Sequence, residues 1–254
     1  VNYNRDVEVF PVLNGMFTKI YGESPYKSPT DMGVNMAGFC ISNDDVCREA
    51  SHQEIIRRYY TALCNFANGK ATEGEVNKIA LLMKRAKITT ADRKCTIAAQ
   101  ERFERSGLPS AAIELSDGTI LTGETSSLLG PCSALLLNAL KHFAGIAHNV
   151  KLIPQQMIEP IQKTKVTFLH GHNPRLHTDE VLVAISMMSL IDENCKLALE
   201  QLPKLYGAQV HSTVMLSEVD RKTFSKLGIG LTCDPVRKVK DLQTKSVGEE
   251  VDVD

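Results

Sequence analysis

Residues 110–123, SAAIELSDGTILTG, decide the fold class of the larger part of the chain. Two short runs of aliphatic and β-branched residues flank Asp117-Gly118, and an Asp-Gly pair between such runs is a strong signal for a β-hairpin. Pro109 separates these residues from the sequence before them. We therefore expect a unit that contains β-structure to begin at residue 109.

The sequence before the hairpin is typical of helices, because apolar residues recur at helical spacing and two capping-box patterns precede them. Helices are expected over residues 1–22, from the capping boxes at 51–54 and 72–75, and over about 91–105. Residues 23–39 are rich in proline, glycine and polar turn formers and are expected to form an ordered loop. Residues 1–108 are thus predicted to be a mainly helical subdomain.

The sequence after the hairpin alternates between helical and strand patterns. Helices are expected over residues 126–144, 178–205 with a break near 192–194, and 218–226, and strands over 151–153, 165–169, 209–215 and 229–232. Such alternation is typical of an α/β unit, which we place at residues 109–236. Residues 237–254 are charged and lack periodicity, so we expect a flexible tail there.

The composition bears on partners and on location. The net charge is only −1, so there is no general electrostatic reason to expect nucleic acid or acidic lipid as a partner. The longest apolar runs, such as residues 181–191, are too short to cross a bilayer. The seven cysteines form no C-x-x-C pair and suit a reducing compartment, which favours the cytoplasm. Because the chain starts at Val1 without methionine and in mid-pattern, we expect a fragment of a longer protein.

Several familiar catalytic motifs are absent from the sequence. There is no G-x-x-x-x-G-K-[ST] phosphate loop, no H-E-x-x-H zinc motif and no G-x-S-x-G elbow. The hairpin followed by an apolar helix invites comparison with zinc nucleobase deaminases, which hold their metal partly through P-C-x-x-C. Pro131-Cys132 is present, but Leu135 stands where the second cysteine should be. A deaminase zinc site is not expected, no metal is assigned to this chain, and any cofactor stays unknown.

The stretch HGHNPRLH, which ends at His177, holds three histidines and one arginine. His170, His172 and His177 offer three nitrogens for zinc if the loop brings them together. Alternatively, Asn173, Arg175 and His177 form an anion pocket with the N–H groups of the following helix. The third interpretation is a polar network with a structural role only. These interpretations stay open, with the anion pocket preferred to the metal site.

Two further segments hold candidate ligand-binding residues. His211, Ser212 and Thr213 end an expected strand, and ligands commonly bind at strand ends in α/β sheets. In the expected loop at residues 23–39, Asp31 and Asn35 are placed to contact a ligand, although a self-bonded turn explains them equally well. We therefore include both segments among the candidates for ligand binding.

Seven segments follow one another in an order that resembles a single bacterial family. They are VNYNRDVEVFPVLNGMF, SPTDMGVNMAGF, ASHQEIIRRYY, GPCSALLLNALK, NPRLHTDEVLVA, AQVHSTV and KLGIGLTCDP. On these motifs the chain, from residue 1 to about 235, resembles the C-terminal half of the domain-of-unknown-function family numbered 1846, an uncharacterised protein family. Relatives carry a preceding α/β region with a glycine-rich stretch, G-P-G-S-G-K, which resembles a phosphate-binding loop and is missing from this sequence.

The resemblance implies a helical subdomain followed by a three-layer α/β subdomain with cytidine-deaminase-like topology, and it implies no settled activity. Asn173, Arg175 and His177 match the family pattern, as do residues 211–213, whereas residues 170–172 depart from it. A zinc set that needs all three histidines would then be peculiar to this sequence.

The leading hypothesis is an uncharacterised bacterial cytoplasmic enzyme that binds a phosphate, nucleotide or other anionic ligand. Arg175 would clamp the anion, and His177 or His211 would act as the acid–base group. The protein's own N-terminal half, with the glycine-rich stretch, would complete the site. A homo-oligomer is expected, with neither nucleic acid nor membrane as partner. The alternatives are a non-catalytic assembly or binding module and a metal-dependent hydrolase that uses the histidine loop.

Overall fold

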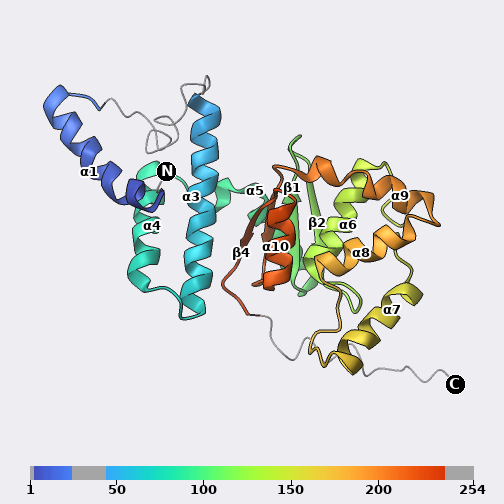
Figure 1. Ribbon diagram of the computed structural model, residues 1–254. Coiled ribbons are helices and arrows are strands. Elements are labelled where there is room, and N and C mark those ends of the chain that lie inside the picture. Colours follow the sequence, from blue (N-terminus) through green and yellow to red (C-terminus); the bar gives the residue numbers. More distant parts are fainter. Residues whose placement is uncertain (1–2, 25–43, 238–254) are drawn as a thin grey trace. The chain divides into compact units, whose positions relative to one another are not determined.

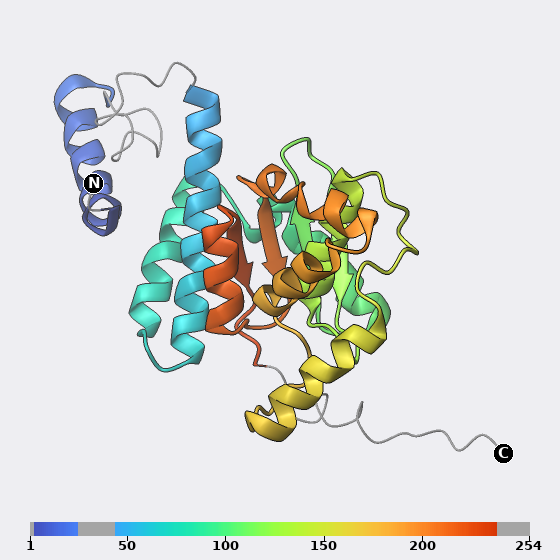
Figure 2. The same ribbon diagram turned by 45° about the vertical axis from the view of Figure 1, so that its right-hand side comes forward.

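The computed structural model describes residues 3–24 and 44–237, and the chain divides into two compact units, whose elements are drawn in Figures 1 and 2. The first, which we call the helical unit, covers Val1–Arg93. The second, which we call the α/β unit, covers Lys94–Asp254 and contains the hairpin that the sequence predicts.

The helices of the helical unit, as far as it is described, are α1 (Tyr3–Tyr21), α3 (Asp44–Ala67) and α4 (Glu73–Ala86), followed by the 3-10 turn η2 (Thr90–Asp92). α3 and α4 form a helical hairpin with a core of Ile55, Ile56, Tyr60, Leu82, Met83 and Ile88. α4 begins at the expected capping box: the Thr72 hydroxyl accepts from the Glu75 N–H at 3.4 Å, and the Thr72 N–H donates to the Glu75 carboxylate at 3.2 Å. The prediction of α4 from its start signal is confirmed.

α3 does not begin at Ser51, where the capping-box pattern predicted a helix start. The helix begins at Asp44, because residues such as Glu49 and Ala50 favour helix and extend it toward the N-terminus. Arg48 also pairs with Asp45, one turn earlier, at 2.9 Å. Ser51 is therefore a buried residue in the interior of a longer helix.

The α/β unit is built on a four-stranded sheet in the order β2-β1-β3-β4. Its strands are β1 (Ser110–Glu114), β2 (Ile120–Glu124), β3 (Gln209–Ser212) and β4 (Gly230–Cys233). β1 pairs antiparallel with β2 and β3, and β3 pairs parallel with β4. The expected hairpin is confirmed: Gly118 has a left-handed φ of 83°, and the Asp117 carboxylate accepts from the Thr119 N–H at 2.8 Å.

Helices lie on both faces of this sheet. Those that the structure describes are α5 (Lys94–Ser106), α6 (Pro131–Phe143), α7 (Gln155–Lys163) with the π-helical turn η3 (Thr164–Phe168), α8 (Thr178–Met188), α9 (Glu193–Leu199), the 3-10 turn η4 (Leu202–Leu205) and α10 (Glu218–Lys226). α8 packs on α6 and α10, and α10 also packs on β4. The helix expected at about 91–105 is thus present as α5, preceded by η2.

Two contacts identify the faces that α5 and α6 cover. Ala112 of β1 packs against α5. Gly123 of β2 lies against the backbone of α6, where an added Cβ would stand 2.4 Å from a nitrogen of that helix. Gly123 pairs with Ala111, and successive side chains on a strand point to opposite faces, so α5 and α6 cover opposite faces. The mixed α/β architecture is confirmed, and the finer cytidine-deaminase-like topology stays a prediction.

Two expected strands do not form. Residues 165–169 fall largely in η3, which continues α7. Residues 151–153 precede α7 without strand pairing, although Leu152 and Ile153 are buried there. A short apolar run is compatible with either a strand or a buried turn, and the sequence does not say whether a neighbouring strand is available. Both strand predictions are wrong for this reason.

The start of α6 also differs from its prediction at residue 126. Residues 126–129 form a turn in which the Ser126 hydroxyl accepts from the N–H groups of Leu128 and Leu129. α6 begins at Pro131, whose fixed φ suits the first position of a helix.

The division between the units lies before α5 and not after it. We expected it between residues 108 and 109, whereas the compact units meet between Arg93 and Lys94, because α5 packs on β1 and β3. The expected loop at 23–39 lies mainly outside the described residues, as does the expected tail at 237–254 apart from its first residue. Among the described residues, no helix is both long and apolar enough to pass through a membrane.

Candidate functional site

The segment before α8 is fixed to the start of α6. Leu176 forms a parallel bridge with Leu129, and its N–H donates to the Leu128 carbonyl at 3.0 Å. The buried Ser133 hydroxyl donates to the Leu176 carbonyl at 2.8 Å. His177 follows directly and occupies the N-cap position of α8 with extended backbone. The sequence-predicted His177 is therefore held at a defined place, where the chain turns into a helix.

Asp220 of α10 is the centre of the polar contacts around His177. Its buried carboxylate accepts hydrogen bonds from the Thr178 N–H and hydroxyl, both at 3.0 Å, and from the Ser217 hydroxyl at 2.7 Å. His177 Nδ1 lies 3.0 Å from the same carboxylate. We call His177, Thr178, Ser217 and Asp220 the Asp220 network. It joins the N-termini of α8 and α10 through one negative charge, which both helix dipoles favour.

The hydrogen bonds decide the ionisation of Asp220. Burial by itself would raise the pKa of the Asp220 carboxyl, but hydrogen bonds from His177, the Thr178 N–H and Ser217, with the charge of His177, hold it well below its ordinary value of 3.8. Asp220 is therefore a carboxylate at neutral pH and can only accept hydrogen bonds from its neighbours.

The ionised Asp220 fixes the tautomer of His177. Because the carboxylate only accepts, His177 Nδ1 carries the proton that joins the two groups. Nε2 of the neutral imidazole then bears the lone pair. The part of the chain that the structure describes shows no hydrogen bond to Nε2, and 21% of the His177 side chain is exposed. The imidazole can thus exchange a proton through Nε2.

Ser217 does not complete a serine–histidine–aspartate triad. Its hydroxyl donates to Asp220 and accepts from the Asp220 N–H at 3.2 Å, so it serves as the N-cap of α10. The hydroxyl also lies 3.3 Å from His177 Nδ1, the nitrogen that carries a proton. A serine nucleophile must instead give its proton to a histidine lone pair. Ser217 is therefore a structural member of the network.

Lys165 connects the loop before α8 to the helix itself. Its Nζ donates to the Arg175 carbonyl at 2.7 Å and to the Glu180 carboxylate at 2.8 Å. Glu180 in turn accepts from the His177 N–H at 2.7 Å. The Lys165 side chain is only 13% exposed, so this ion pair is shielded more than a surface pair. It supports the backbone on both sides of His177.

The Arg175 side chain contacts the turn before α6. Its Nε donates to the Ser126 carbonyl at 2.6 Å, and burial lowers the pKa of its guanidinium. The Asn173 side chain accepts from the Arg175 N–H at 3.2 Å, which is a local turn contact. Two carboxylates accept from backbone N–H groups at the start of α8: Asp220 of α10 and Glu180 of α8 itself. Two carboxylates of the protein thus lie where the anion pocket was expected, and the anion pocket itself stays a prediction.

His211 lies apart from His177. It pairs with Ala112 in the sheet and so shares the face that α5 covers, whereas α8 and α10 pack with α6 on the opposite face. The fully buried His211 contacts Thr232 Oγ1 through Nδ1 at 2.8 Å. Its Nε2 is 3.4 Å from the Asp234 carboxylate, within ion-pair distance but outside hydrogen-bond geometry. The expectation that His177 and His211 serve one site is corrected by the alternation of side chains along β3.

The remaining candidate residues of the strand end support the backbone. The Ser212 hydroxyl donates to the Val214 carbonyl at 2.9 Å, and the Thr213 hydroxyl bonds both the N–H and the carbonyl of Ser110. Ser212 and Thr213 are buried, and a role in ligand binding stays a prediction for them. Asp31 and Asn35 lie outside the described residues.

The three histidines of the loop do not form a metal site in the described part of the chain. His170 has a left-handed φ of 53°, His172 is exposed, and His177 is turned to Asp220. Over residues 3–24 and 44–237, no group of three histidine, cysteine, aspartate or glutamate side chains is arranged to hold a metal ion.

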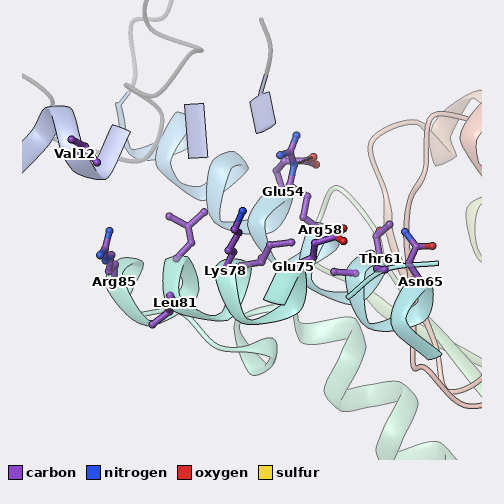
Figure 3. A pocket seen from close by; sticks show the side chains of 13 residues that line it. Val12, Glu54, Arg58, Thr61, Asn65, Glu75, Lys78, Leu81 and Arg85 are labelled. Atoms are coloured by element: carbon purple, nitrogen blue, oxygen red, sulfur yellow. Dashed lines mark hydrogen bonds and ion pairs between the residues drawn. The ribbon is translucent and has the colours of Figure 1, made fainter. Parts of the chain in front are cut away.

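A cavity of about 1090 Å³ lies in the helical unit (Figure 3). Its charged lining residues are Glu54, Arg58, Glu75, Lys78 and Arg85, from α3 and α4. Glu54 pairs with Arg58 at 3.1 Å, and Glu75 caps α4. None of the expected site residues that the structure describes lines this cavity. We therefore place the candidate site at the Asp220 network.

Sequence reasoning missed Asp220 and Ser217. The signal was present, because Ser217-Glu-Val-Asp220 is a serine followed three residues later by an acid, a start pattern of helices. That pattern predicts the cap of α10, and it does so correctly. It does not predict that the acid also binds a histidine 43 residues earlier, which needs the packing of α8 on α10.

The fold and the site define a mixed α/β protein in which a buried carboxylate orients a partly exposed histidine between two helix starts. The chain belongs to the family of the domain of unknown function DUF1846. The model of the C-terminal domain matches residues 91–242, and that of the N-terminal domain matches residues 1–87.

Two relatives show the extent of the similarity. The chain is 50% identical over 234 residues to the UPF0371 protein cu0538 of Corynebacterium urealyticum. The aligned region covers 92% of this chain and 47% of the relative. It is 48% identical over 245 residues to the UPF0371 protein SpyM50764 of Streptococcus pyogenes serotype M5. This aligned region covers 96% of this chain and 50% of the relative. The chain therefore spans about half the length of these curated relatives.

The matches correct the expectation that the chain represents the C-terminal half of the family alone. Residues 1–87 match the model of the N-terminal domain, so sequence of both family domains is present. The two models meet between residues 87 and 91, close to the division of the compact units at Arg93. The expectation that sequence of the N-terminal domain is absent from this chain is therefore wrong.

Proposed function

We propose that this chain carries the proton-transfer site of an enzyme, in which His177 is the acid–base group and Asp220 orients it. The observation that carries the proposal is the 3.0 Å contact between the Asp220 carboxylate and Nδ1 of an imidazole that is 21% exposed. A carboxylate on one ring nitrogen fixes the tautomer and leaves the other nitrogen for the reacting group.

The chemistry follows from the charges of the pair. Nε2 of neutral His177 accepts a proton from a substrate O–H or N–H group, and the imidazolium that results faces the Asp220 carboxylate. The same nitrogen then returns the proton to a leaving group or a product. General acid–base catalysis of this kind contributes about 10² to 10⁴ in rate.

The surroundings of His177 favour a substrate that needs no cationic clamp. Lys165 is paired with Glu180, Asp220 with His177, and Arg175 bonds the backbone of Ser126. These pairings support an uncharged polar substrate over a phosphate or a nucleotide, which the sequence alone had favoured. The proposal therefore keeps His177 as the acid–base group and assigns Arg175 to structure.

The tautomer gives a test that needs no substrate. Imidazole ¹⁵N spectra of the protein should show the proton of neutral His177 on Nδ1, and in Asp220→Asn this preference should be lost. His172 is exposed and belongs to the same loop, so its spectrum should not change in that variant. A neutral His177 with its proton on Nε2 in the wild-type protein would overturn the orientation that we assign.

Turnover provides the second test. Phosphorylated and unphosphorylated metabolites should be screened with the wild-type chain, and any activity compared in His177→Gln, Asp220→Asn and the control His172→Gln. We expect His177→Gln to lower kcat by at least about 10² and His172→Gln to leave it unchanged. A folded His177→Gln protein with wild-type kcat would remove His177 from the reaction.

A further inference from the structure

The outer face of α8 carries an apolar stripe in addition to the buried face. Val183, Met187, Leu190 and Ile191 are 61%, 62%, 84% and 79% exposed. They are spaced at i, i+4, i+7 and i+8, and the last two extend the helical turn, since the Ile191 N–H donates to the Met188 carbonyl at 3.0 Å. We call these four residues the α8 stripe.

The core of the protein does not account for this stripe. The packing of α8 on α6 and α10 is made by the opposite side of the helix, where Val181, Ile185 and Met188 are buried. Single exposed apolar residues are ordinary on protein surfaces, but a contiguous group of four large ones is typical of an interaction site.

The stripe carries no charge. The polar residues beside it are Ser186 and Ser189, whose hydroxyls donate to carbonyls of the same helix at 2.7 Å. The acids Asp179 and Asp192 stand only at the two ends, where each accepts from a helix N–H. In a contact with two-fold symmetry every charge at the centre faces a like charge of the other copy. A stripe without charge avoids this repulsion and offers nothing to a partner selected by charge.

The exposed area fits an interface between two copies. Four side chains at these exposures present on the order of 500 Å² of apolar surface, near the upper end for the largest patch of a soluble monomer. An interface of standard size takes about 800 Å² from each partner, and about two-thirds of its core is apolar. The stripe has the area that the apolar core of such an interface needs.

We propose that the α8 stripe is a self-association surface, on which α8 of one copy packs against α8 of a second copy across a two-fold axis close to Met187. Met187 is the middle residue of the stripe, so in this arrangement it meets the partner's Met187, and Val183 meets the far end of the partner's stripe. This surface goes beyond the proton-transfer site, since it gives the chain a partner and not a reaction.

Charge substitutions at Met187 test the proposal directly. The molar mass of the 254-residue chain should be measured by light scattering and by sedimentation over a range of concentrations. We expect a dimer for the wild type, and at least tenfold weaker association for both Met187→Glu and Met187→Lys. An equimolar mixture of these two variants should recover a dimer, because opposite charges then meet at the axis. Met187 is 62% exposed, so both variants should keep the fold, which circular dichroism checks.

A charge at an exposed position away from the α8 stripe is the control for the Met187 variants. Leu81→Glu places the same charge at a 58% exposed position of α4 and should leave the dimer intact, as should His177→Gln. A wild-type chain that stays monomeric at about 100 µM would overturn the proposal. So would dimers of undiminished affinity in both Met187 variants, or variants that do not recover association when mixed. Because His177→Gln dimerises in our proposal, failure of the proposed activity and failure of the interface are distinguishable.

Discussion

His177 Nδ1 and Asp220 Oδ2 lie 3.0 Å apart, although the two residues are 43 positions apart in the sequence. One belongs to the start of α8 and the other to the first turn of α10. The carboxylate receives four hydrogen bonds there, so a single side chain caps one helix, neutralises the start of another and orients an imidazole. Structure and the proposed chemistry thus depend on the same atoms.

Replacement of Asp220 by asparagine should destabilise the α/β unit. The amide keeps one acceptor but loses the charge, and its NH₂ group faces donors that require an acceptor. Loss of one partner of a buried, hydrogen-bonded pair costs about 3 kcal/mol in the free energy of unfolding. Urea denaturation of Asp220→Asn measures this cost. Asp179→Asn, which removes an exposed acid from the first turn of α8, is the control and should keep the wild-type midpoint. Equal midpoints in the two variants would contradict our account.

The low pKa of Asp220 should make unfolding sensitive to acid. Since the folded pKa lies below the unfolded value of about 3.9, the stabilisation is complete above that value and is lost as the pH falls through it toward the folded pKa. We expect the urea midpoint to be steady between about pH 5 and 7 and to fall below about pH 4. In Asp220→Asn the slope below pH 4 should be shallower, and an unchanged slope would show that other carboxyls dominate.

The fold could be predicted where the sequence carries a local signal. Asp117-Gly118 predicts the hairpin because only a few residue pairs suit its turn, and Thr72 predicts the start of α4 because its side chain and that of Glu75 cap the helix. The wrong strands at 151–153 and 165–169 rest on apolar residues alone. Whether such residues form a strand depends on a pairing partner that is remote in the sequence.

The candidate site could be predicted only in part. His177 and Arg175 were found because they flank a helix start, which is local information. Their roles could not be assigned, since the partner of His177 lies on α10 and that of Arg175 on the turn before α6. His211 is a candidate from the sequence because it ends an expected strand, where ligands commonly bind in α/β sheets. Its face of the sheet follows from the register of β3 with β1, which the sequence does not give.

Cys195 should be unreactive in the folded protein. Burial, with the charge of Asp192, raises the pKa of its thiol to about 11, and its Sγ–H donates to the Leu152 carbonyl at 2.9 Å. Since the thiolate is the nucleophile, alkylation by iodoacetamide at pH 8 should be slow for Cys195 and fast once the chain is unfolded in urea. Mass spectrometry of the peptides measures both rates. Rapid labelling of Cys195 under native conditions would contradict the buried position that the structure gives it.

Gly123→Ala should be among the most damaging single substitutions in the α/β unit. An alanine Cβ would stand 2.4 Å from a backbone nitrogen of α6, and a helix backbone cannot move aside as a flexible side chain can. Overpacking of this kind should force α6 away from β2, and we expect it to cost about 3 kcal/mol in the free energy of unfolding.

Gly74→Ala is the matched control, because its Cβ would meet only the Thr72 hydroxyl at 3.8 Å in the first turn of α4. There alanine favours the helix, and the melting temperature should stay equal or rise. Thermal melts of the two variants give the comparison, and a Gly123→Ala protein that melts with the wild type would show that α6 and β2 are not in the close contact described.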